Sequence, residues 1–76
     1  MTKFVVSLGS ITDVKAFVNT VTKYDFEIDL ISGRYVVDAK SIMGIFSLDL
    51  GKPIDVEAHC DNCDKLLEEL APFIQK

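Results

Sequence analysis

Residues 26–48 read FEIDLISGRYVVDAKSIMGIFSL, and most of the expected architecture follows from them. The first half alternates apolar and polar residues around Ser32-Gly33, which is typical of two strands joined by a tight turn. The second half begins at Ser41, a favoured helix N-cap, and continues with apolar residues at helical spacing. This stretch therefore predicts a β-hairpin followed by a short helix over residues 41–48.

The same two periodicities extend to both sides of this stretch. Residues 54–58 alternate apolar with polar side chains. In residues 4–8, Phe4, Val6 and Leu8 alternate with Val5 and Ser7 as in a half-buried strand, so both stretches predict strands. Between residues 8 and 26, apolar residues recur at i, i+3, i+4 and i+7, as on one face of a helix. These residues are Val14, Phe17, Val18 and Val21. A second apolar stripe, near the end of the chain, predicts a last helix. Its members are Cys63, Leu66, Leu67, Leu70 and Ile74.

The ends of the two longer helices are also marked. Ser10 or Thr12 can cap the first, because a hydroxyl oxygen accepts a hydrogen bond from a free backbone N–H. Asp61 or Asn62 is expected to cap the last helix, and Pro72 is expected to kink or end it.

The element order and composition together predict one α+β domain, spanning 1–76. Of the 76 residues, 49% are hydrophobic and 26% are charged, which supplies a core and argues against disorder. The expected order is β-α-β-β-α-β-α. Clean alternation and a two-residue turn favour a four-stranded antiparallel sheet with three helices on one face, an open-faced β-sandwich.

Charge and hydropathy exclude two classes of partner. The net charge is −4 and Arg34 is the single arginine, whereas nucleic-acid binding needs clustered basic residues. No apolar run approaches the roughly 20 residues that span a bilayer, and the N-terminus lacks a signal-peptide profile. We therefore expect a cytoplasmic protein that binds neither nucleic acid nor membrane.

A C-x-x-C pair follows the single histidine of the chain. Cys60 and Cys63 would offer two metal ligands and His59 a third, whereas a structural zinc site needs four. Cys63 also falls on the apolar stripe, where a free cysteine packs as a small hydrophobic residue. We expect no metal, no cofactor and no catalytic residue, and the role of these three side chains stays open.

Residues 23–25 (KYD) and 38–48 (DAKSIMGIFSL) closely resemble the histidine-containing phosphocarrier protein HPr of the bacterial sugar phosphotransferase system. The resemblance covers nearly the whole chain. It is strongest over residues 23–50 and weak after residue 58. It implies the HPr-like open-faced sandwich, in the element order already expected from the periodicities.

The resemblance also shows a departure from the family. Members carry a phosphoryl group on a histidine at the start of the first helix, but Ser10 occupies that position and Thr12 that of a nearby arginine. A serine ester is too stable for phosphoryl relay, and threonine offers no charged fork. The chain is thus expected to be a non-enzymatic homologue, similar to the histidine-lacking HPr homologues of catabolite repression.

Ser41 matches the regulatory serine of the family, which a dedicated kinase phosphorylates in Gram-positive bacteria. The resemblance implies a serine kinase/phosphorylase and a transcriptional regulator of carbon metabolism as partners. A phosphate at a helix N-terminus is compatible with the fold. The expected partner-binding residues are Lys40, Ile42, Met43 and Phe46, with the last three forming an exposed apolar patch.

Two alternatives stay open. In the first, Ser41 is only a helix cap and the chain is a structural or interaction domain without phosphorylation. Exchange of the first strand between protomers is one form of this, because short hinges favour swapping. In the second, the chain is an ordinary phosphocarrier of the sugar phosphotransferase system. A monomer and a weak homodimer are both compatible with the sequence.

Overall fold

Seven elements follow one another in residues 1–74, the part of the chain that the computed structural model describes. They are β1 (Thr2–Val6), α1 (Ile11–Val21), β2 (Ile28–Ser32), β3 (Tyr35–Asp38), α2 (Ile42–Phe46), β4 (Ile54–Ala58) and α3 (Asp64–Leu70). The predicted β-α-β-β-α-β-α order is confirmed. No helix among these residues has the length and apolar composition needed to cross a bilayer.

The four strands form one antiparallel sheet in the order β1-β4-β2-β3. The β2–β3 turn differs by one residue from the expectation, because Ser32 pairs with Tyr35 and leaves Gly33-Arg34 as the loop. Gly33 has a φ of 61°, and it is the one residue of the described chain with a positive φ. A glycine in the first loop position is what a type II′ hairpin turn requires. This turn geometry therefore moves the loop one residue along the chain.

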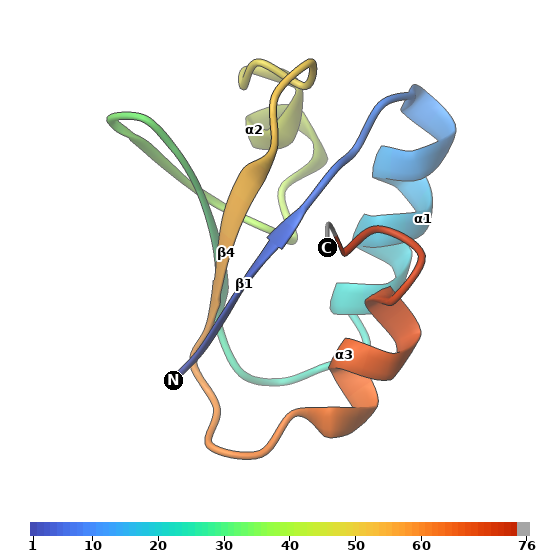
Figure 1. Cartoon of the computed structure of the whole chain (residues 1–76), viewed down its shortest axis with the longest axis vertical. Helices are drawn as coiled ribbons and strands as arrows, with labels where there is room; N and C mark the ends of the chain where they lie inside the picture. Colours follow the sequence, from blue (N-terminus) through green and yellow to red (C-terminus); the bar gives the residue numbers. More distant parts are fainter. Residues whose placement is uncertain (75–76) are drawn as a thin grey trace.

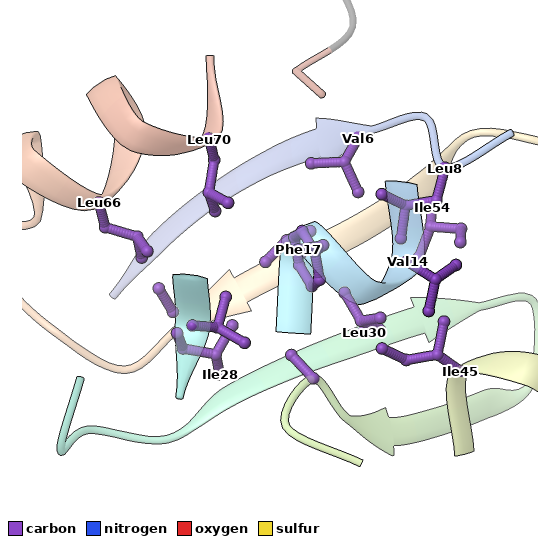
Figure 2. Packing of buried hydrophobic residues seen from close by; sticks show 14 of the residues in the cluster. Val6, Leu8, Val14, Phe17, Ile28, Leu30, Ile45, Ile54, Leu66 and Leu70 are labelled. Carbon is purple, nitrogen blue, oxygen red and sulfur yellow. The ribbon is translucent and has the colours of Figure 1, made fainter. Parts of the chain in front are cut away.

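The helices lie on one face of the sheet, as expected. Figure 1 shows α1 and α3 side by side against this face, with α2 near one end of the sheet. The core lies between the two layers, and Figure 2 shows labelled side chains from helices and strands turned toward one another there. Phe17 of α1, Ile45 of α2 and Leu66 of α3 are fully buried in it. No polar or charged side chain of the described residues is buried.

The start of α3 corrects one expectation. The helix begins at Asp64 with Cys63 as its N-cap, and no side chain makes a capping bond from that position. Cys63 is only 6% exposed, so its burial against the core sets where the helix begins. Asp61 and Asn62 are therefore left in the preceding loop, although the Asn62 side-chain oxygen accepts a 3.5 Å bond from the Asp64 N–H.

The end of α3 follows the prediction from Pro72. The helix stops at Leu70, and the chain then turns back toward β1. The apolar stripe suggested that Ile74 lies on the last helix, but Ile74 follows the end of α3. It forms an antiparallel bridge with Val6, and the Ser7 N–H donates to the Phe73 carbonyl at 2.8 Å.

Candidate functional site

Ser41 caps the N-terminus of α2 with its side chain exposed. Its backbone is extended (φ −100°, ψ 101°), and its Oγ accepts the Gly44 N–H at 3.3 Å. The Ser41 N–H in turn donates to the Asp38 carbonyl at 2.9 Å. The expected capping role is confirmed, and the hydroxyl is held at a defined point of the surface.

Gly44 leaves room for this hydroxyl. A Cβ at position 44 would lie 3.3 Å from Ser41 Oγ and 3.4 Å from Val37 Cβ. The absence of a side chain therefore lets the first turn of α2 sit close to both the serine and β3. Nothing in the hydropathy pattern alone would have revealed this requirement.

Lys40 is anchored rather than free. Its Nζ donates to the Tyr24 carbonyl at 2.6 Å, and its N–H donates to Asp38 Oδ1 at 2.9 Å. The first bond joins residues 23–25 to the start of α2, so the two stretches that resemble HPr most closely touch in space. Through this bond to the loop that follows α1, Lys40 helps to fix the position of the neighbouring Ser41.

The apolar residues of α2 divide into exposed and covered ones. Met43 is 77% exposed and Phe46 is 40% exposed, whereas Ile45 is fully buried. Ile42 is half-buried and packs against the core, so of the three residues expected in the exposed apolar patch it is the least accessible. Helical phase explains this, because Ile42 lies three residues before Ile45 on nearly the same side. We call Ser41, Met43 and Phe46 the α2 surface.

The N-terminus of α1 is a capped helix end that contains a carboxylate. Ser10 Oγ accepts the Asp13 N–H at 3.2 Å, and Asp13 Oδ2 accepts the Gly9 N–H at 3.3 Å. None of the ion pairs in residues 1–74 reaches this turn. A phosphoryl dianion placed here would meet the Asp13 carboxylate, which no ion pair of the described residues neutralises, and like charges repel. Thr12 is exposed and supplies no charge.

Ile11, the first residue of α1, was not singled out from the sequence and is 62% exposed beside Ser10. It lies three residues before Val14 and seven before Val18, so helical spacing extends the apolar stripe of α1 to this exposed first residue and was the available signal.

His59 lies far from this helix end. It follows β4, and β4 runs antiparallel to β1 with Ala58 opposite Thr2 and Ile54 opposite Val6. His59 is therefore near the start of β1, whereas Ser10 follows its end. The imidazole Nε2 is 2.8 Å from Asp29 Oδ2, so its partner is a carboxylate on β2. This histidine cannot replace one at the start of α1.

The two cysteines are free thiols at the β4–α3 junction, Cys60 half-buried and Cys63 buried. Burial, reinforced by a hydrogen bond with the Cys63 thiol, raises the pKa of Cys60 to about 11. Cys60 is consequently protonated near neutral pH, and a thiol is a poor nucleophile and metal ligand. In residues 1–74, no three His, Cys, Asp or Glu side chains are arranged to hold a metal ion.

A polar cluster of Lys23, Tyr24 and Glu69 joins the loop after α1 to α3. Lys23 Nζ lies 2.5 Å from Glu69 Oε2, and the Tyr24 hydroxyl bonds the other oxygen of the same carboxylate. The hydrogen bond to Glu69 raises the pKa of Tyr24 to about 12. The hydrogen bond from Lys23, and to a smaller extent that from Tyr24, lowers the pKa of Glu69. The cluster pins the loop after α1 to α3, so its role is structural.

The family model PTS-HPr, described as "PTS HPr component phosphorylation site", matches residues 13–76. The match begins at Asp13, so the equivalence of Ser10 with the family's histidine lies outside it and stays a prediction. No curated protein sequence matches the chain.

Several solved structures share the fold. The phosphocarrier protein HPr from Bacillus anthracis is 28% identical with a TM-score of 0.72, covering 97% of this chain and 94% of that one. HPr-C-His from Thermoanaerobacter tengcongensis is 24% identical with a TM-score of 0.77, covering 95% and 89%. The histidine-containing phosphocarrier protein of a Mycoplasma is 18% identical with a TM-score of 0.76, covering 99% and 100%.

Proposed function

Since this chain belongs to the HPr family of phosphotransferase-system phosphocarriers, we propose that it is a regulatory, non-enzymatic member that binds other proteins through the α2 surface. Ser41 is the proposed phosphorylation switch, and Met43 and Phe46 are the proposed docking residues. One observation supports this above the others: the exposed Ser41 hydroxyl caps the helix that presents these two exposed apolar side chains. The proposed partners are a serine kinase/phosphorylase and a transcriptional regulator of carbon metabolism.

The α1 end of the molecule supports a role other than phosphoryl relay. The single histidine, His59, lies at the opposite end of β1 from Ser10. Asp13 holds a carboxylate beside Ser10, the position expected to match the family's phosphorylated histidine, and a carboxylate there would repel a phosphoryl dianion. A serine ester at Ser10 would in addition be too stable to pass its phosphoryl group onward.

Phosphorylation of Ser41 would change the chemistry of the α2 surface sharply. A phosphoserine adds close to two negative charges at neutral pH. These charges would stand beside two exposed apolar side chains, so a basic pocket with an apolar rim on the partner would distinguish the modified from the unmodified form.

The first test is a kinase reaction with ATP and an HPr serine kinase from a Gram-positive bacterium. We expect phosphate on the wild type and none on Ser41→Asn. Asparagine keeps the N-cap hydrogen bond, so its failure to react cannot be blamed on a lost helix. An unmodified wild type, beside a family phosphocarrier that accepts phosphate in the same tube, would favour an interaction domain without phosphorylation.

Docking is tested on the phosphorylated protein with a carbon-catabolite regulator. Met43→Ser and Phe46→Ser should each weaken binding about tenfold, as loss of a well-placed apolar anchor does. Val36→Thr removes a similarly exposed apolar residue from β3 and should have no effect. Equal binding by all three variants would remove the α2 surface from the proposal.

A carrier assay addresses the second alternative. With phosphoenolpyruvate and the first enzyme of the phosphotransferase system, we expect no acid-labile label on this chain. The Bacillus anthracis phosphocarrier serves as the positive control. Label that forms here and moves on to a sugar permease would establish a phosphocarrier instead.

A further inference from the structure

The face of the sheet opposite the helices presents its side chains in two rows that run across the strands. In the first row, Val5, Asp55, Ile31 and Val36 stand opposite one another in turn. In the second row, Lys3, Glu57, Asp29 and Asp38 do the same. We call these eight residues the open face, which no other element of residues 1–74 covers.

The second row places carboxylates directly opposite one another. Glu57 faces Asp29, and Asp29 faces Asp38, although like charges on adjacent strands repel. Lys3 approaches Glu57 at 3.4 Å, the His59 imidazole lies 2.8 Å from Asp29, and the Lys40 N–H donates to Asp38 Oδ1, so Lys3 supplies the one permanent positive charge of this row.

The first row adds a fourth carboxylate and an apolar strip. Asp55 is exposed and takes part in no ion pair among the described residues. The open face thus has four carboxylates and one lysine. Val36 is 62% exposed, while Val5 and Ile31 are half-buried beside it. A hollow of about 380 Å³ lies over Val5, Ile31 and Asp55.

We propose that the open face binds a cationic amphipathic helix of another protein. The distance from β1 to β3 is three strand spacings, or about 14 Å, which a helix spans in about ten residues. Such a helix can lay one apolar ridge along Val5, Ile31 and Val36, and a Lys or Arg beside that ridge can reach Asp55, which stands between Val5 and Ile31. Its neighbouring ridge of Lys or Arg then faces the carboxylate row and relieves the repulsion within it.

Charge selects this partner over a second copy of the chain. Stacking two open faces would bring carboxylates against carboxylates, and like-charge contacts at an interface are costly. A cationic helix has the opposite sign and supplies the missing counter-charges. This site lies on the other side of the sheet from the helices, so it is independent of the α2 surface.

The test uses a synthetic helical peptide with leucine at i, i+4, i+7 and i+11 and lysine along the adjacent ridge. Binding is measured by fluorescence anisotropy, and amide shift changes map the site. We expect saturable binding to the wild type, shift changes on the open face, and weaker binding at high salt. Asp55→Lys and Val36→Thr should each weaken binding about tenfold.

Matched controls separate docking from general attraction. Glu68→Lys makes the same charge change on exposed α3 and should keep wild-type affinity, as should Met43→Ser. A peptide of the same composition in scrambled order should not bind. Several outcomes would each overturn the proposal: no binding to the wild type, equal binding by Asp55→Lys, equal binding of the scrambled peptide, or a dimer held through the open face.

Discussion

At the scale of single residues, Glu69 concentrates the long-range polar contacts of the molecule. Its two carboxylate oxygens bond Lys23 and the Tyr24 hydroxyl, which are 46 and 45 residues away in sequence. The consequence is opposite pKa shifts, downward for Glu69 and upward to about 12 for Tyr24. Both pKa shifts make the free energy of unfolding depend on pH, because each group binds its proton with a different affinity in the folded and unfolded chain.

Tyr24→Phe should therefore change how stability depends on pH. The folded-state pKa of Tyr24 is above its unfolded value of 10, so the contribution of the phenol is fully present below pH 10 and lost toward pH 12. We expect the free energy of unfolding of wild type and Tyr24→Phe to differ below pH 10 and to converge above it. Urea unfolding at a series of pH values measures this.

Glu69→Gln tests the acidic side of the same cluster. The pKa of Glu69 is lowered in the folded state, so its contribution to the free energy of unfolding is present above the unfolded pKa and fades as pH falls through the folded pKa.

Tyr35→Phe, which removes a hydroxyl from a 70% exposed tyrosine, is the control for Tyr24→Phe and should follow the wild type. Parallel curves for Tyr24→Phe and wild type from pH 8 to 12 would contradict the assigned bond.

At the scale of elements, the parts that sequence predicts well are those fixed by local chemistry. Ser41 and Ser10 cap their helices as expected, because capping needs only a side-chain oxygen and an N–H three residues away. The start of α3 was missed because burial of Cys63 against the core overrides the local preference for Asp61 or Asn62. The bonds to Glu69 were missed for the same kind of reason, since they depend on how distant elements meet.

The segment after α3 stabilises the edge of the sheet. Phe73 is half-buried, packs edge-on against Phe17 at 6.2 Å between ring centroids, and accepts the Ser7 N–H through its carbonyl.

Phe73→Ala should lower the free energy of unfolding by about 2 kcal/mol, less than for a fully buried phenylalanine. Phe73→Leu, which keeps most of the apolar contact, should cost about half as much. A lower urea midpoint at unchanged m-value is the expected result, and an unchanged midpoint would show that the segment does not hold β1.

At the scale of the whole molecule, the core is complete within one chain. Sixteen apolar residues are buried, contributed by every element except β3 and including residues of the connecting loops. No buried side-chain nitrogen or oxygen in residues 1–74 lacks a hydrogen-bond partner. The core therefore does not need a second copy to complete its packing or to satisfy its polar groups.

Exchange of β1 between protomers would need residues 7–10 to straighten into a hinge. That change would strain two bonds made by this loop, Gly9 N–H to Asp13 and Ser7 N–H to the Phe73 carbonyl. We therefore expect a monomer, by light scattering, and a melting temperature that stays constant over about a hundredfold range of protein concentration. A dimeric mass with a melting temperature that rises with concentration would contradict this and favour the strand-swapped interaction domain. A dimer whose dissociation constant changes in Asp55→Lys would instead place the interface on the open face, since only that face presents Asp55.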